Sequence, residues 1–233
     1  MCKRIIPVAA VLMAMLVSGC SSDKGSLQGV NTGQASKMNA ARSQFERSED
    51  PPLTADTHFA AGQLNETQGA IPKAIEQYQD ALKLNPKHVP SLFRLALAYS
   101  QLKRYPEAIE AWNRYIAATN QAAAGYSNLA FCQELAGDPA GAENSYKQGI
   151  TRDPKNQPCR VNYGLLLTRQ GRLEEARAQF SAVLTPAQVH YNIASVFQQQ
   201  GHKDAARREY SEAIKADPKL IDAQTRLSEL EKN

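Results

Sequence analysis

The side chains that most often carry catalysis or bind metals are sparse in this chain. It has four histidines, and their positions are His58, His88, His190 and His202. None belongs to a His-Glu-x-x-His pattern or to another paired metal-ligand spacing. The sequence also lacks a phosphate-binding glycine loop, a serine nucleophile elbow and a dinucleotide-binding glycine pattern. We therefore predict no catalytic residue, no metal site and no cofactor, and we expect a protein that is not an enzyme.

Two cysteines in the middle of the chain raise the question of a disulfide. Cys132 and Cys159 would pair only in an oxidising compartment. We place them on successive helices, about seven residues apart along the axis, which is about 10 Å at 1.5 Å per residue. A disulfide needs Cα atoms within about 7 Å of each other. This separation favours two buried free thiols over a bridge.

A third cysteine, Cys20, stands in a context that suits covalent modification. The chain begins MCKRIIPVAAVLMAMLVSGC, with a basic start and an apolar run of 13 residues from Ile5 to Val17. Such a run is too short to span a bilayer comfortably but suits the core of a secretory signal. The tetrapeptide Val17-Ser18-Gly19-Cys20 resembles the lipobox of bacterial lipoproteins, with Val17 where Leu is more common.

The lipobox resemblance implies a lipid anchor. Residues 1–20 would be a signal peptide, and Cys20 would become the acylated first residue of the mature chain, carrying diacylglyceryl and palmitate-type acyl groups. Each buried CH₂ contributes about 0.8 kcal/mol, so two or three acyl chains hold a protein firmly on a membrane. Ser21, in place of an Asp, favours the outer membrane, facing the periplasm. The alternative is an ordinary secretory signal in which Cys20 is incidental, giving a soluble periplasmic or secreted protein.

Residues 21–53 are rich in Ser, Gly, Asn, Gln and Asp, and this composition predicts a flexible linker. Within it, residues 36–47 are compatible with a transient helix. Its apolar residues at helical spacing are Met38, Ala41 and Phe45. Pro51 and Pro52 then end any helix and mark the start of the folded domain.

The rest of the chain is repetitive. Three segments end alike, with Ala, an aromatic residue four positions on, and Pro eight positions after that: AIEQYQDALKLNP, AENSYKQGITRDP and ARREYSEAIKADP. Pro86 and Pro154 are 68 residues apart, which is twice 34. A period of 34 residues is that of the tetratricopeptide repeat, and the residues resemble that family.

The resemblance extends to fixed positions, numbered from the start of each repeat. Position 8 is small: Gly62, Ala96, Ala130, Gly164 and Ala194. Position 20 is alanine: Ala74, Ala108, Ala142, Ala176 and Ala206. Position 24 is aromatic: Tyr78, Trp112, Tyr146, Phe180 and Tyr210. Small residues at positions 8 and 20 let the two helices of a repeat, A and B, approach closely, and the aromatic ring fills the remaining gap.

The predicted domain covers residues 54–233. Its repeats are residues 55–88, 89–122, 123–156, 157–186 and 187–220, followed by a capping helix at residues 219–232 that makes the end of the array soluble. The fourth repeat is short, and we expect Thr185 to cap a helix that starts at Pro186, which leaves the preceding helix about one turn short. The predicted class is all-α: a right-handed superhelix of helix-turn-helix units.

The family resemblance implies a binding groove on the concave face, lined by the A helices. The candidate residues at positions 5, 6 and 9 are Phe59, Gln63, Phe93, Leu97, Ser127, Asn128, Phe131, Val161, Asn162, Leu165, Tyr191 and Asn192. An apolar floor with a polar margin suits a peptide or helix with apolar anchors, and the asparagines suit its backbone. For Phe93 and Phe131, packing against neighbouring helices is an equally open interpretation. The Lys and Asn clamp that some family members use for a carboxylate is absent.

Charge argues against a nucleic-acid partner. The formal net charge is +4, and loss of Lys3 and Arg4 with the signal leaves 25 basic and 23 acidic residues, a net of +2. We predict a non-enzymatic interaction scaffold or adaptor, lipid-anchored in the bacterial envelope, similar to lipoproteins of pilus, secretion or envelope assembly. Its partner would be a protein or peptide rather than a small-molecule substrate. The alternatives are a regulatory subunit of an envelope enzyme and a soluble periplasmic or secreted protein.

Overall fold

The computed structural model describes residues 53–232 of the 233-residue chain. The predicted signal peptide, Cys20 and all of the predicted linker except Leu53 lie outside these residues. The described part contains eleven helices and no strand. No helix in this part combines the length and the apolar character needed to cross a membrane.

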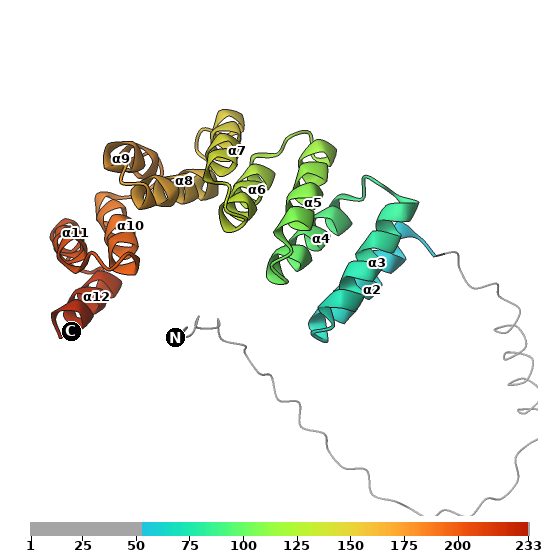
Figure 1. Ribbon diagram of the computed structural model, residues 1–233, viewed down its shortest axis with the longest axis horizontal. Helices are drawn as coiled ribbons and strands as arrows, with labels where there is room; N and C mark the ends of the chain where they lie inside the picture. The colour runs from blue at the N-terminus through green and yellow to red at the C-terminus, as the bar shows by residue number, and fades with distance from the viewer. Residues whose placement is uncertain (1–52, 233) are drawn as a thin grey trace, which may run out of the picture. The chain divides into compact units, whose positions relative to one another are not determined.

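Ten of these helices form five consecutive pairs, and in each pair the first is an A helix and the second a B helix. The pairs are α2 (Ala55–Thr67) and α3 (Ile71–Leu84), α4 (Val89–Gln101) and α5 (Tyr105–Ala118), α6 (Ala123–Leu135) and α7 (Pro139–Arg152), α8 (Gln157–Arg169) and α9 (Leu173–Ser181), and α10 (Pro186–Gln199) and α11 (Lys203–Ala216). A last helix, α12 (Ile221–Glu231), follows α11. The pairs succeed one another along an arc, with α6, α8 and α10 toward its inside (Figure 1). The predicted all-α solenoid of helix pairs is confirmed.

Close contact between the two helices of a pair depends on the small residues. All five position-20 alanines have no exposed surface, and the position-24 aromatic rings are at most 1% exposed. A Cβ atom added at Gly62 would lie 2.3 Å from the ring of Tyr78, and one added at Gly164 would lie 2.6 Å from the ring of Phe180. In these two pairs the aromatic ring therefore lies directly against the backbone of the A helix.

The fourth pair differs from the others. Thr185 caps α10 through a capping box with Gln188, and Pro186 is the first residue of that helix, as predicted. The helix before it, α9, has 9 residues, whereas α3, α5, α7 and α11 each have 14. The predicted shortening is therefore confirmed, and at five residues it is somewhat larger than the one turn expected. The backbone N–H groups of Val183 and Leu184 both bond to the carbonyl of Phe180, which ends α9 in a tight turn.

A charged cluster links the third pair to the fourth. Glu143 on α7 accepts hydrogen bonds from Arg172, at the start of α9, and from Tyr163 on α8, at 2.7 and 2.8 Å. Lys147 lies 2.7 Å from the same carboxylate. The guanidinium of Arg172 and the ammonium of Lys147 lower the pKa of Glu143 to about 2. The carboxylate therefore stays ionised and connects three helices at neutral pH.

The packing predicts that the volume at position 20 limits stability. Changing Ala108→Leu on α5, where the side chain has no exposed surface, should lower the free energy of unfolding by about 1–3 kcal/mol because the added carbons separate α4 from α5. Urea denaturation followed by circular dichroism measures the loss. The matched control is Ala117→Leu, which adds the same atoms at an exposed site on the same helix and should change stability little. Equal losses for both variants would contradict the packing argument.

Candidate protein-binding groove

Two adjoining hollows lie between α2 and α4. The first has a volume of about 380 Å³, and its lining residues are Phe59, Gln63, Val89, Pro90, Phe93, Arg94 and Tyr115. The second shares Gln63 and Arg94 with it and is extended by Glu66. The structure therefore brings together Phe59, Gln63 and Phe93 from the predicted set. Their surroundings are largely aromatic, with Arg94 and Glu66 as the charged groups at the edge.

The rings that line this hollow are also held by the core. The Phe93 ring centroid lies 5.4 Å from that of Trp112 and 5.6 Å from that of Tyr115. Phe59 lies 5.8 Å from Tyr78. Both phenylalanines are partly buried against the same cluster. The two interpretations of Phe93 are therefore compatible, because one face of a ring can pack while its edge remains accessible.

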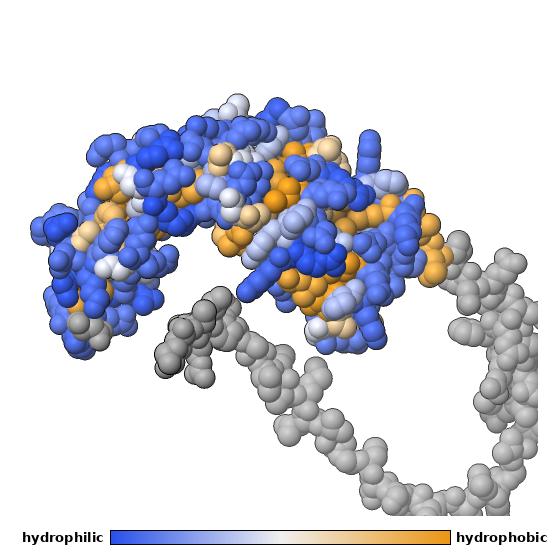
Figure 2. Space-filling model, in the orientation of Figure 1, coloured by the Kyte–Doolittle hydropathy of each residue, from blue (hydrophilic) through white to orange (hydrophobic). Residues whose placement is uncertain are grey.

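Phe131 on α6 is different, because it has little packing of its own. Its side chain is 50% exposed, and Leu135, one turn later on the same helix, is 46% exposed. Figure 2 shows apolar surface gathered over the N-terminal half of the domain, around α4 and α6. Leu135 stands at position 13 of its repeat and is not among the predicted groove residues, which came from positions 5, 6 and 9. The sequence does contain a sign of its role, because Leu135 follows Phe131 by four residues and residues four apart share one face of a helix.

The remaining predicted groove residues are engaged with their own helices or neighbours. Leu97, Val161, Leu165 and Tyr191 are partly buried against the hydrophobic clusters. Ser127 is buried and accepts a hydrogen bond from Asn162 at 3.3 Å. Asn128 and Asn192 each donate to a carbonyl of their own helix, at 3.3 and 2.8 Å. The amide groups of the three asparagines therefore already serve intramolecular bonds.

The charged groups at the groove margin are paired with each other. The Tyr78 hydroxyl donates to Glu66 at 2.6 Å, and Arg94 lies 3.8 Å from the same carboxylate. The arrangement recurs in the third repeat, where Tyr146 donates to Glu134 at 2.7 Å and Arg169 contacts Glu134. Burial and the neighbouring carboxylate raise the pKa of both tyrosines well above the ordinary value. The polar groups at the margin of the groove are therefore bonded to one another, and they lie around its apolar floor.

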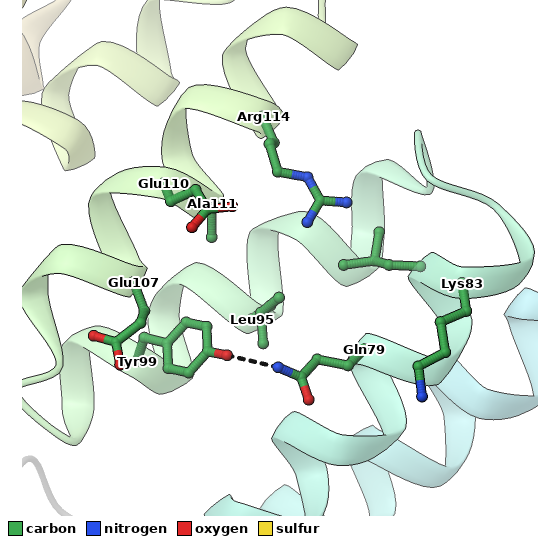
Figure 3. A pocket seen from close by; sticks show the side chains of 9 residues that line it. Gln79, Lys83, Leu95, Tyr99, Glu107, Glu110, Ala111 and Arg114 are labelled. Carbon is green, nitrogen blue, oxygen red and sulfur yellow. Dashed lines mark hydrogen bonds between the residues drawn. The ribbon is translucent and has the colours of Figure 1, made fainter.

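A separate pocket lies between α3, α4 and α5 and has a volume of about 480 Å³ (Figure 3). Its lining residues are Gln79, Leu82, Lys83, Leu95, Tyr99, Glu107, Glu110, Ala111 and Arg114. The Gln79 amide donates to the Tyr99 hydroxyl at 2.8 Å across its floor. The predicted groove residues all lie on A helices, whereas this pocket is lined mainly by the B helices α3 and α5, so it was not among the predicted sites. The basic and acidic side chains around it balance, so it offers polar contacts without a single charge preference.

The candidates for chemistry have structural roles in the described residues. His58 contacts Gln77 at 2.9 Å, and His190 contacts Glu209 at 2.7 Å. Cys132 and Cys159 are free and buried, as predicted. Burial raises the pKa of the Cys159 thiol to about 11, which keeps it protonated and unreactive near neutral pH. Within residues 53–232, no group of three or more histidine, cysteine or acidic side chains is placed to hold a metal ion.

Comparison with known protein families gives the identity of the fold. Models described as tetratricopeptide repeat match residues 35–88 and 59–124, residues 135–189, and residues 187–220. The chain belongs to the tetratricopeptide repeat family. Proteins of this family are generally non-catalytic scaffolds for protein–protein interaction.

Curated relatives share only part of their length with this tetratricopeptide repeat protein. Hsp70-Hsp90 organizing protein 3 of Arabidopsis thaliana is 30% identical over 86 residues, which cover 37% of this chain and 15% of that protein. The general transcriptional corepressor ssn6 of Schizosaccharomyces pombe is 27% identical over 134 residues, or 57% of this chain and 12% of the corepressor. The likeness is therefore confined to a small portion of each relative.

Solved structures show the same fold at low identity. MamA protein is 19% identical with a TM-score of 0.60, covering 72% of this chain and 94% of that one. YrrB, described as a tetratricopeptide repeat protein with an unusual peptide-binding site, is 20% identical with a TM-score of 0.54 over 79% of this chain and 95% of its own. A thermophilic tetratricopeptide repeat protein of Thermus thermophilus is 22% identical with a TM-score of 0.53, over 77% of this chain and 100% of its own. These likenesses establish the repeat architecture.

The two phenylalanines should respond differently to truncation. Phe93→Ala removes ring contacts with Trp112 and Tyr115 and should lower the free energy of unfolding by about 2–3 kcal/mol. Phe131→Ala removes a half-exposed ring and should cost less than about 1 kcal/mol. Chemical denaturation of the two single variants measures both values. A loss for Phe131→Ala as large as that for Phe93→Ala would show that Phe131 is a packing residue and not an accessible anchor.

Proposed function

We propose that this protein is a lipid-anchored scaffold in the bacterial envelope that binds a peptide or helix through apolar anchors on its A helices. The observation that carries the binding part is the exposed pair Phe131 and Leu135 on α6. Large apolar side chains cost free energy in contact with water, and an exposed pair on one helix face is typical of a surface that a partner covers.

The physics of recognition favours a partner segment with its own apolar side chains. Burying half of a phenylalanine and half of a leucine together contributes about 2 kcal/mol, because complete burial of one such side chain contributes about 1.5–3 kcal/mol. The aromatic hollow at Phe59 and Phe93 supplies a second, largely rigid contact. A helix with anchors at intervals of three or four residues, or an extended peptide with alternating anchors, matches such a surface. The paired charges at Glu66 and Glu134 would then form a polar rim.

The envelope part of the proposal rests on the first twenty residues. Basic residues, an apolar run of 13 residues and the sequence Val17-Ser18-Gly19-Cys20 support acylation of Cys20. Ser21 supports the outer membrane, with the repeats facing the periplasm. A membrane-tethered scaffold without catalytic groups of its own suits the assembly of a multiprotein envelope structure, such as a pilus, a secretion complex or an envelope-building complex.

Capture of a partner should depend on the exposed pair on α6. Crosslinking in intact membranes, followed by purification of the full chain, should recover a specific protein. The double change Phe131→Asp and Leu135→Asp should reduce its recovery at least tenfold, because two charges replace the anchors at exposed sites. The control is Ile221→Asp, at a 64% exposed apolar residue on α12 that lies away from α6 in sequence. Undiminished capture by the double variant, with capture also unchanged by the control, would disprove the α6 anchor.

Acylation of Cys20 is testable separately. In the native host, the wild-type chain should incorporate labelled palmitate and partition into detergent and membrane fractions. Cys20→Ser should abolish the label and leave an unprocessed or soluble product, because the acyl acceptor is lost. The matched control is Cys132→Ser, which removes a buried thiol and should keep the label. A soluble wild-type protein without label would favour the soluble periplasmic or secreted alternative.

A further inference from the structure

The pocket between α3, α4 and α5 shares no lining residue with the two hollows between α2 and α4. Leu82, Leu95 and Ala111 form its apolar part, and all three are buried. Its volume of about 480 Å³ falls within the range of about 300–1,000 Å³ that is typical of small-ligand pockets. The pocket is therefore large enough for a ligand and has a surface on which an apolar group can pack.

The equivalent place between α7 and α9 is occupied by charged side chains. There Arg172, the residue before α9, donates to the carboxylate of Glu143 on α7 at 2.7 Å. Arg104 stands at the same repeat position as Arg172, but the residue equivalent to Glu143 is Ile75, which is buried. Arg104 bonds instead to Glu107 on α5, at 2.7 Å. No ion pair joins α3 to α5 in the part of the chain that the structure describes, and the pocket lies between these two helices.

A hydrogen-bonded pair of side chains lies at one end of the pocket. Tyr99 is 6% exposed, and its hydroxyl oxygen accepts a bond from the Gln79 amide nitrogen at 2.8 Å (Figure 3). Within residues 53–232, no other hydrogen bond involves the Tyr99 hydroxyl or the side-chain carbonyl of Gln79. The pair can therefore still donate one bond and accept another, which are the two bonds that a peptide group makes.

Two opposite charges on α5 line the same pocket without pairing with each other. Glu110 and Arg114 are one helical turn apart. Among the described residues Glu110 has no ion pair, and the hydrogen bond of Arg114 is a long one, at 3.5 Å, to the carbonyl of Pro86. Figure 3 shows the Arg114 side chain extending from α5 into the pocket. A ligand there meets a carboxylate and a guanidinium fork whose residues lie about 6 Å apart along the helix axis.

We propose that this pocket binds a short zwitterionic peptide of two or three residues with free ends. The carboxylate of the peptide pairs with Arg114, and its ammonium group pairs with Glu110. A peptide group bonds to Tyr99 and Gln79, and an apolar side chain packs against Leu95. An extended peptide of two or three residues spans about 7–11 Å. This length matches the four to seven residues of α5 that line the pocket, which is about 6–10 Å.

The presence of both charges disfavours simpler ligands. An anion without a positive group would approach Arg114 but would be repelled by Glu110 and Glu107. A cation without a negative group would meet the reverse problem at Arg114 and Lys83. A peptide with blocked ends would keep the bonds to the side-chain pair at Tyr99 but lose both ionic contacts. Free ends therefore specify the ligand, and this site does not depend on the α6 anchor pair or on the lipid anchor.

Titration of the isotope-labelled full chain with the tripeptide Ala-Leu-Ala, followed by NMR, tests the proposal. Shifts should be confined to α3, α4 and α5 and should include the side-chain amide of Gln79. Arg114→Gln and Glu110→Gln should each weaken binding at least tenfold, because each removes one charge-assisted contact at an exposed site. The matched controls are Arg208→Gln on α11 and Glu76→Gln on α3, which change exposed residues of the same types and should keep the wild-type affinity.

Three results would overturn the proposal. The first is the absence of shifts at about 10 mM tripeptide, where even a complex with a millimolar Kd would be mostly formed. The second is binding that neither Arg114→Gln nor Glu110→Gln weakens. The third is equally strong binding of the same tripeptide with an acetylated amino end and an amidated carboxyl end, because the pocket would then recognise a segment within a longer chain.

Discussion

The domain depends on the close approach of two helices at a pair of small side chains. The position-20 alanines are fully buried, and at the two position-8 glycines the aromatic ring at position 24 lies directly against the backbone of the A helix, so small residues at both positions allow the two helices to approach closely. Each ring is buried between its own pair and the next A helix, so one contact stabilises both the repeat and its junction. The array as a whole follows from this local geometry, because each unit has contacts mainly with its neighbours.

The groove follows from the same geometry. Phe93 on α4 is partly buried, and its ring is fixed by Trp112, the position-24 residue of the same pair. The aromatic hollow is therefore formed before a partner arrives, and little side-chain entropy is lost on binding. Phe131 has no comparable neighbour among the ring contacts of the described residues. Its energetic contribution would come from the water released when a partner covers it.

Sequence periodicity predicted the fold because few residue types satisfy the packing positions. Alanine at position 20 and an aromatic residue at position 24 are required by space, so they identify the helix pairs. The candidate site was only partly predictable. Leu135 and the pocket at Gln79 and Tyr99 depend on which side chains remain uncovered after the helices have stacked. Exposure is a property of neighbouring repeats together, and a single repeat pattern does not contain it.

The length of α9 was also only partly predictable from the sequence, and it has a structural consequence. The position of Pro186 indicated a shortened helix, but the tight turn at Phe180 removes five residues relative to the other B helices. A shorter B helix offers less apolar surface to the next pair. Phe180 on α9 still shares a buried cluster with Val189 and Ile193 on α10. An ion pair also crosses this junction, because Arg177 on α9 lies 2.6 Å from Glu209 on α11. Because a B helix of 9 residues has less apolar surface to bury than one of 14, and a partly exposed ion pair contributes little, we expect the junction between the fourth and fifth pairs to be held less strongly than the others. In a solenoid, where coupling passes only between neighbours, that junction is where the C-terminal pair would open first.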